Sequence, residues 1–202
     1  MLASKTMRIP FPAAVLAGGA SRRMGVPKGS LPYGAGTLAE HQTRRLAPLF
    51  SEVWLVVREE PGYPFGPARL LFDSDPERSA LSGVTRALEE AADRVFVLAV
   101  DLPLAGEDLL LAIARRSLET GAAAVLPASE RGLEPLAGVW RRAALPEAHR
   151  RAAAGDRSLR GLAEAVGAEI LPPDRWRAAD PSGNAFENLN TISDWTAARE
   201  RA

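Results

Sequence analysis

The chain contains no cysteine and only two histidines among its 202 residues. The lack of cysteine excludes disulfide bonds, thiol nucleophiles and zinc–thiolate sites. Two histidines are also too few to build a multi-histidine metal site. A divalent cation must therefore be held by carboxylates, amides and phosphates, and these are the ligands that Mg²⁺ prefers.

An excess of charge of one sign is missing as well, and so are long apolar runs. The 25 basic and 25 acidic residues give a formal net charge of +0, whereas non-specific nucleic-acid binding needs a basic surface. No stretch approaches the ~20 apolar residues of a membrane helix. Pro10 and Pro12 interrupt the apolar N-terminal run, which favours a strand over a targeting segment. We therefore expect a cytoplasmic protein without nucleic-acid or membrane partners.

Apolar runs alternate with helical patterns along the chain. Strands are predicted at residues 13–17, 52–57, 70–72, 94–100, 122–126, 136–140 and 168–171, and helices at residues 37–49, 81–92, 108–120, 142–154, 159–166 and 192–200. This alternation predicts an α/β fold with a mostly parallel, twisted sheet and helices on both faces. The length predicts a single domain over residues 1–202, with residues 1–6 as a disordered tail.

Three residues suited to ligand binding stand directly after predicted strands. Gly18, Asp73 and Asp101 each occupy such a position. In open α/β sheets ligands bind beyond the carboxyl ends of the strands, so these residues are candidates for one site. Each aspartate also has a plain structural alternative: Asp101 is suited to cap the next helix, and Asp73 to form a turn with Asp75.

The loop over residues 16–29 reads LAGGASRRMGVPKG. Gly18 and Gly19 leave backbone amides open to a phosphate or a base edge. Arg23 and Lys28 add positive charge suited to phosphates, and the chain has only one other lysine. The loop matches neither the P-loop nor the dinucleotide-binding glycine pattern. It therefore indicates a nucleotide-binding turn of another kind.

This loop resembles the N-terminal motif of the molybdenum cofactor guanylyltransferases (the MobA family), a branch of the nucleotidyltransferase superfamily. The resemblance continues in Asp73-Ser74 with SALSG at residues 79–83, in VLAVDLPL around Asp101, in Glu134-Pro135-Leu136 with DRSL at residues 156–159, and in FENLNT at residues 186–191. The asparagines of the last motif favour guanylyl over cytidylyl transfer, because cytidylyl relatives more often carry aspartates there. Arg58 departs from the pattern, since relatives often have a nucleotide-contacting asparagine after the second strand.

The resemblance implies a Rossmann-like nucleotidyltransferase fold and a set of site residues. It assigns nucleotide binding to Leu16, Ala17, Gly18, Gly19, Lys28, Asp73 and Asp101. Catalytic roles fall to Arg23, Lys28 and Asp101, with Asp101 as the Mg²⁺ ligand. Asn188 and Asn190 belong on the side of the pterin or of the transferring phosphate.

The activity that the resemblance implies is transfer of GMP from GTP to molybdopterin, with release of pyrophosphate. GTP and molybdopterin are then the partners, together with transient contacts to cofactor-biosynthesis or acceptor proteins. One alternative is a molybdopterin cytidylyltransferase or another nucleotidyltransferase acting on a small phosphorylated molecule. The other is a non-catalytic module that senses GTP or carries the cofactor.

Overall fold

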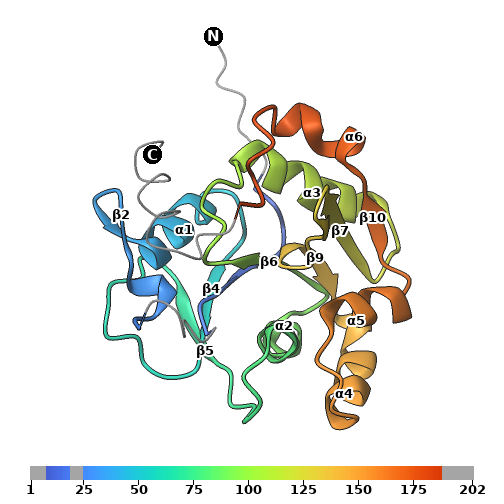
Figure 1. Cartoon of the computed structure of the whole chain (residues 1–202), viewed down its shortest axis with the longest axis horizontal. Helices are drawn as coiled ribbons and strands as arrows, with labels where there is room; N and C mark the ends of the chain where they lie inside the picture. Colours follow the sequence, from blue (N-terminus) through green and yellow to red (C-terminus); the bar gives the residue numbers. More distant parts are fainter. Residues whose placement is uncertain (1–7, 19–24, 188–202) are drawn as a thin grey trace.

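The computed structural model describes residues 8–18 and 25–187 (Figure 1). The predicted tail at residues 1–6 and the predicted helix at residues 192–200 lie outside these ranges. The strands of the main sheet follow the order β10-β7-β9-β6-β1-β4-β5, and β8 pairs with β7. No described helix is long and apolar enough to cross a membrane.

The sequence prediction of alternating strands and helices is confirmed within the described residues, with shifts of a few residues at the element ends. The strands are β1 (Ala13–Leu16), β4 (Val53–Val57), β5 (Arg69–Phe72), β6 (Arg94–Ala99), β7 (Ala124–Ser129), β8 (Gly132–Leu133), β9 (Ala137–Arg141) and β10 (Glu169–Leu171), and β2 (Pro32–Tyr33) with β3 (Gly36–Thr37) forms a separate hairpin. The helices are α1 (Leu38–Leu46), α2 (Ala80–Glu90), α3 (Glu107–Glu119), α4 (Leu145–Ala153), α5 (Leu159–Ala165) and α6 (Pro173–Trp176), and 3₁₀ turns cover Lys28–Ser30, Arg142–Ala144 and Arg177–Ala179.

The sheet is mostly parallel, as predicted, but it is mixed at one strand. β1 pairs in parallel with β4 and β6, β4 with β5, and β7 with β10. β9 runs antiparallel to both of its neighbours, β6 and β7. Its apolar sequence alone could not reveal this direction, because a buried strand is apolar in either orientation.

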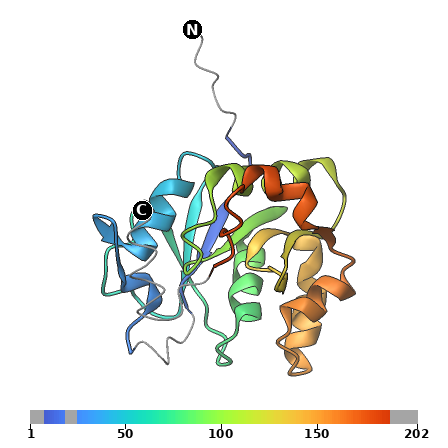
Figure 2. The same ribbon diagram turned by 45° about the horizontal axis from the view of Figure 1, so that its top comes forward.

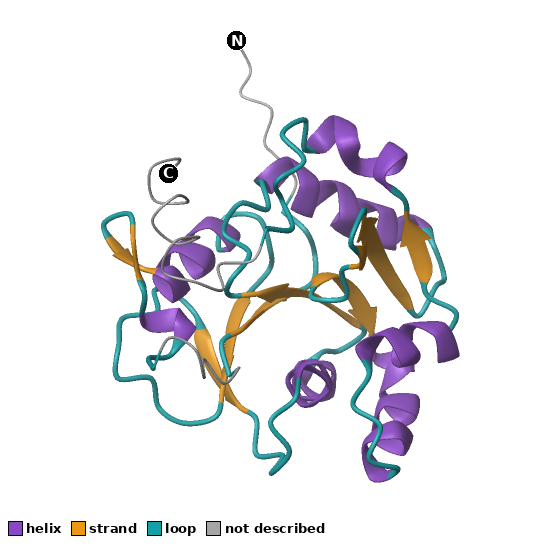
Figure 3. Ribbon diagram, viewed as in Figure 1, coloured by secondary structure: helices purple, strands orange, loops and turns teal. Residues whose placement is uncertain are grey.

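Helices cover both faces of the sheet (Figure 3). One core cluster joins the sheet to α1, α3 and α6, and the other joins it to α2, α4 and α5. Alternate residues along a strand serve the two cores: in β6, Phe96 and Leu98 lie in the first cluster, and Val95 and Val97 in the second. Figure 2 shows the same layers from another angle.

The chain changes direction across the sheet at β1. From β1 it proceeds to β4 and then β5 on one side, and it returns to place β6 on the other side of β1. Such a switch opens a crevice beyond the carboxyl ends of the two strands that flank it, and this crevice is where open α/β sheets bind ligands. The topology therefore puts the residues that follow β1, β4, β5 and β6 around one crevice.

Candidate active site

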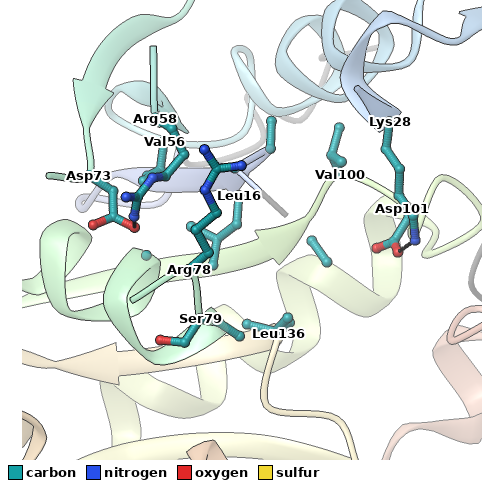
Figure 4. Close-up of a pocket in the computed structure, with 15 residues that line it drawn as sticks. Leu16, Lys28, Val56, Arg58, Asp73, Arg78, Ser79, Val100, Asp101 and Leu136 are labelled. Atoms are coloured by element: carbon teal, nitrogen blue, oxygen red, sulfur yellow. Dashed lines mark hydrogen bonds and ion pairs between the residues drawn. The ribbon is translucent and has the colours of Figure 1, made fainter. Parts of the chain in front are cut away.

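A cavity of about 210 Å³ lies beyond the carboxyl ends of β1, β4, β5 and β6 (Figure 4). Apolar side chains form its middle, namely those of Leu16, Val56, Val100 and Leu136. Lys28 and Asp101 lie at one end, and Arg58 and Asp73 at the other, with Arg78 reaching between them. The three cationic and two anionic side chains leave the cavity net positive, which suits an anionic ligand with a flat apolar part.

Lys28 and Asp101 form a direct ion pair. The Lys28 Nζ lies 2.5 Å from the Asp101 Oδ2, and the two side chains are 21% and 17% exposed. Lys28 begins a 3₁₀ turn, and Asp101 follows β6 by two residues. The N-cap of α3 is Gly106, so Asp101 does not have the capping role that its position also allowed. Two residues 73 apart in sequence thus meet at one end of the cavity.

The end of the cavity that holds Lys28 and Asp101 is suited to a cation that binds together with a phosphate-bearing substrate. The described residues contain no group of three or more His, Cys, Asp or Glu side chains that could form a complete metal cage. Asp101 therefore offers a single, partly exposed carboxylate. Mg²⁺ is commonly held in this way, by one or two carboxylates together with substrate phosphates and water.

Asp73 lies at the opposite end and is 7% exposed. Its Oδ1 accepts a hydrogen bond from the Asp75 amide at 3.0 Å, so the predicted turn role is real. Its Oδ2 accepts from the Ser82 hydroxyl at 2.7 Å and lies 3.3 Å from the Arg58 Nη1. Both carboxylate oxygens are therefore engaged, and Asp73 fixes Arg58 and the first turn of α2 relative to β5.

Sheet hydrogen bonds continue past the end of β1 and hold the floor of the cavity. The Leu16 carbonyl accepts from the Val100 amide at 3.1 Å, and the Ala17 amide donates to the Val56 carbonyl at 3.0 Å. The sequence predicts that the backbone of residues 16–18 contacts the nucleotide. Neither of these two bonds uses the Ala17 carbonyl or the Gly18 amide. Gly18 packs against the stem of Arg58, and a Cβ at this position would be in ordinary van der Waals contact with the Arg58 Cγ, 3.4 Å away.

The start of α2 is a part of the site that the predicted helix boundary missed. The helix begins at Ala80, and Ser79 caps it through a reciprocal pair of hydrogen bonds with Ser82. A Cβ on Gly83 would meet Leu16 Cδ1 at 3.2 Å, so glycine lets α2 approach β1 closely. The S-x-x-S spacing was the available signal, but it is weaker than the S-x-x-E form of a capping box.

Arg78 is a second cavity residue that sequence reasoning did not select. It precedes the Ser79 cap and makes no hydrogen bond or ion pair with the described residues. Figure 4 shows its side chain extending across the cavity beside Leu16. Of the other predicted site residues, Gly19, Arg23, Asn188 and Asn190 lie outside the described ranges.

Two side chains of α1, the buried Gln42 and the half-buried Arg45, fix the loop that carries Asp101. The Gln42 amide donates to the Val100 carbonyl at 3.0 Å, and Arg45 donates to the carbonyls of Leu102, at 3.2 Å, and Ala105. Burial lowers the pKa of Arg45 to about 10, and the nearby Glu107 partly offsets this effect. The guanidinium is still charged at neutral pH, so these bonds are charge-assisted.

We expect Arg45→Met to lower both turnover and stability. Two carbonyls of the loop after Asp101, those of Leu102 and Ala105, would lose a charged donor, which costs about 1–3 kcal/mol of unfolding free energy. The loosened loop should also reduce kcat roughly tenfold, because catalytic geometry is sensitive to small displacements. Urea denaturation and steady-state kinetics measure the two effects.

Arg44→Met is the matched control for Arg45→Met. The Arg44 side chain is 67% exposed, and its one ion-pair partner in the described part of the chain is Glu40, one turn away on α1. Its replacement should leave kcat unchanged and cost less than about 1 kcal/mol. Equal kinetic effects of the two substitutions would show that the bonds from Arg45 do not position Asp101.

Comparisons with known proteins agree with this geometry. The family model described as the MobA-like NTP transferase domain matches residues 13–170, a span that includes every described residue at the cavity ends. The chain belongs to the MobA-like NTP transferase family. Its sheet is therefore that of a nucleotidyltransferase domain.

Two relatives and one solved structure show how far the similarity extends. The chain is 34% identical over 187 residues to a probable molybdenum cofactor guanylyltransferase from Chloroflexus aggregans, covering 89% of each chain. It is 36% identical over 197 residues to a protein of the same name from Mycobacterium avium, covering 91% of this chain and 92% of the relative. The crystal structure of molybdopterin-guanine dinucleotide biosynthesis protein A from Archaeoglobus fulgidus has the same fold, with a TM-score of 0.82, 24% identity and coverage of 94% and 97%.

Proposed function

We propose that this chain transfers GMP from GTP to molybdopterin and releases pyrophosphate. The observation that carries the proposal is the Lys28–Asp101 pair, which lies beside an apolar slot at the switch point of a nucleotidyltransferase sheet. Relatives at 34–36% identity that bear the name molybdenum cofactor guanylyltransferase supply the base and the acceptor.

The reaction needs positioning and charge neutralisation more than proton transfer. A phosphate oxygen of molybdopterin attacks the α-phosphorus of GTP, and the bond from this phosphorus to the bridging oxygen breaks as pyrophosphate leaves. The nucleophile is already an anion, so no general base is required. Lys28 places a compact positive charge beside the reacting phosphates, where negative charge shifts from the nucleophile to the leaving group. The rigid ends of β1 and β6 hold the two reactants in line.

Asp101 is the residue proposed to hold Mg²⁺ between the protein and the triphosphate. The bound ion would neutralise phosphate charge and orient the leaving group. The Asp101 carboxylate stays at its end of the cavity, because Gln42 and Arg45 fix the backbone on either side of this residue. Lys28 would then pair first with the Asp101 carboxylate and afterwards with the phosphates of the bound nucleotide.

The remaining assignments stay proposals for residues outside the described ranges. Gly19 and Arg23 would complete the phosphate-binding loop, and Asn188 and Asn190 would face the pterin or the transferring phosphate. We also propose that residues 1–202 act as one domain in the cytoplasm, with transient contacts to proteins that supply or accept the cofactor.

The two alternatives make different demands on the site. A cytidylyltransferase needs the same phosphate machinery with another base, so only nucleotide preference separates it from a guanylyltransferase. A GTP sensor or cofactor carrier has little need for a lysine and a carboxylate aligned on the phosphates. The Lys28–Asp101 pair therefore favours an enzyme over a carrier.

We expect molybdopterin-dependent release of pyrophosphate with GTP, and much less with CTP, ATP or UTP. An assay coupled to pyrophosphate, run with each nucleotide at equal concentration and with molybdopterin omitted as the control, measures this preference. Faster turnover with CTP would make the protein a cytidylyltransferase. Tight GTP binding without pyrophosphate release would make it a carrier or sensor.

A further inference from the structure

The end of the cavity opposite Lys28 contains an arginine held in one orientation. Arg58 follows β4 directly, and its Nη1 lies 3.3 Å from the Asp73 Oδ2. Asp73 is fixed in turn by the Ser82 hydroxyl and by the Asp75 amide. The stem of Arg58 also packs against Gly18, where a Cβ would lie 3.4 Å from the Arg58 Cγ. This packing and the bond to Asp73 together anchor the Arg58 side chain at this end of the cavity.

Most of the hydrogen-bond donors of Arg58 have no partner among the described residues. A guanidinium carries five N–H donors in a planar fork, and a single hydrogen bond of this group, the one to Asp73, is seen among the described residues. The side chain is 20% exposed and lines the cavity with Leu16 and Val56. The remaining donors of this anchored arginine are therefore available to a ligand in the apolar slot.

The shape and donors of this end fit one edge of a purine. The apolar middle of the cavity suits the faces of a flat base, and the phosphate-binding pair lies beyond it at the other end (Figure 4). Guanine presents two adjacent acceptors, O6 and N7, which arginine binds in a bidentate manner. Adenine presents a donor beside N7, so the same fork would meet a mismatched group.

We propose that Arg58 selects guanine by donating to its O6/N7 edge, with Asp73 and Ser82 as positioning residues. This inference rests on the proposed function, because it takes GTP as the nucleotide bound between Arg58 and Lys28. Asp73 does not read the base itself, since its two oxygens are already occupied by Asp75, Ser82 and Arg58.

Nucleotide analogues test the assignment on the unmodified protein. Binding of GTP, 7-deaza-GTP, inosine triphosphate and CTP is measured by titration calorimetry in the presence of Mg²⁺. Loss of N7 should weaken binding about tenfold, because one charge-assisted hydrogen bond is removed. Inosine triphosphate keeps O6 and N7 and lacks only the 2-amino group, so its affinity should stay within about threefold of GTP.

Substitutions then assign the effect to one residue. Arg58→Ala should weaken GTP binding about tenfold or more and remove the difference between GTP and 7-deaza-GTP. Arg58→Lys keeps the charge but loses the fork, so it should bind GTP with reduced preference over 7-deaza-GTP. Arg78→Ala is the matched change in the same cavity, and it should weaken both nucleotides by the same factor.

Arg150→Ala on α4, a residue 64% exposed and paired with Glu147, controls for the loss of an arginine anywhere. It should leave all four affinities unchanged, and thermal unfolding confirms that each variant is folded. If Arg58→Ala weakens GTP and 7-deaza-GTP equally, Arg58 binds phosphate and the proposal is wrong. Loss of inosine triphosphate binding with 7-deaza-GTP retained would overturn it too, because the other edge of the base would then be read. A wild-type preference for CTP would instead overturn the proposed function.

Discussion

Asp101→Ala is expected to lower kcat/KM for GMP transfer at least about a hundredfold, because the carboxylate that we propose as the cation ligand also pairs with Lys28. Among the described residues, Asp101 supplies the one carboxylate at its end of the cavity, and the substitution also removes its 2.5 Å ion pair with Lys28. The dependence of turnover on Mg²⁺ should weaken in parallel. Pyrophosphate release at a series of Mg²⁺ concentrations measures both effects.

The fold should tolerate Asp101→Ala. The side chain does not cap α3, whose N-cap is Gly106, and partly exposed ion pairs contribute at most about 1 kcal/mol. Asp108→Ala is the matched control, since Asp108 is exposed in the first turn of α3 and faces no part of the cavity. Full Mg²⁺-dependent turnover of Asp101→Ala would show that the cation binds elsewhere.

Lys28→Ala is expected to reduce kcat about a hundredfold while weakening GTP binding by a smaller factor. In the proposed mechanism the lysine charge neutralises negative charge on the reacting phosphates, and this interaction is stronger in the transition state than in the bound substrate. Lys28→Arg keeps the charge in a bulkier, planar group, and it should recover only part of the activity. Single-turnover rates and calorimetric affinities separate chemistry from binding.

The two substitutions should not be additive. Lys28 and Asp101 touch each other, so the double variant should lose less activity than the product of the two single losses. A strictly multiplicative loss would mean that the residues act independently and that their contact has no catalytic consequence. If Lys28→Ala lost only affinity and kept its kcat, Lys28 would stabilise the bound substrate and the transition state equally.

Local patterns in the sequence were sufficient to predict most of the fold. Continuous apolar strands such as residues 94–100 and the alternating helices predicted a sheet covered on both faces, and the cores on the two faces confirm this. The helix predicted at residues 37–49 corresponds to α1, and the Thr37 hydroxyl caps its start by accepting from the Glu40 amide at 3.1 Å. Such features depend on neighbours within a few residues, so they can be predicted without knowing the topology.

The antiparallel direction of β9 and the small hairpin of β2 and β3 were not predicted. Strand direction depends on the path of the connecting segment, and β9 follows β7 after a tight turn through β8, with no crossover helix. Two-residue strands such as Pro32–Tyr33 are too short for a hydrophobic period to appear in the sequence. Both features are therefore decided by chain path and pairing.

The sequence by itself determined the α/β class, the family resemblance and the residues that end each strand. Only the tertiary structure decided how those residues combine. Register and strand order bring Lys28 to Asp101 across 73 positions, and they join Arg58, Asp73 and Ser82 into one anchored group. The physical reason is that the end of a strand is set by local sequence. A contact between two side chains depends on which strands lie side by side, and this is set by the order and register of the sheet.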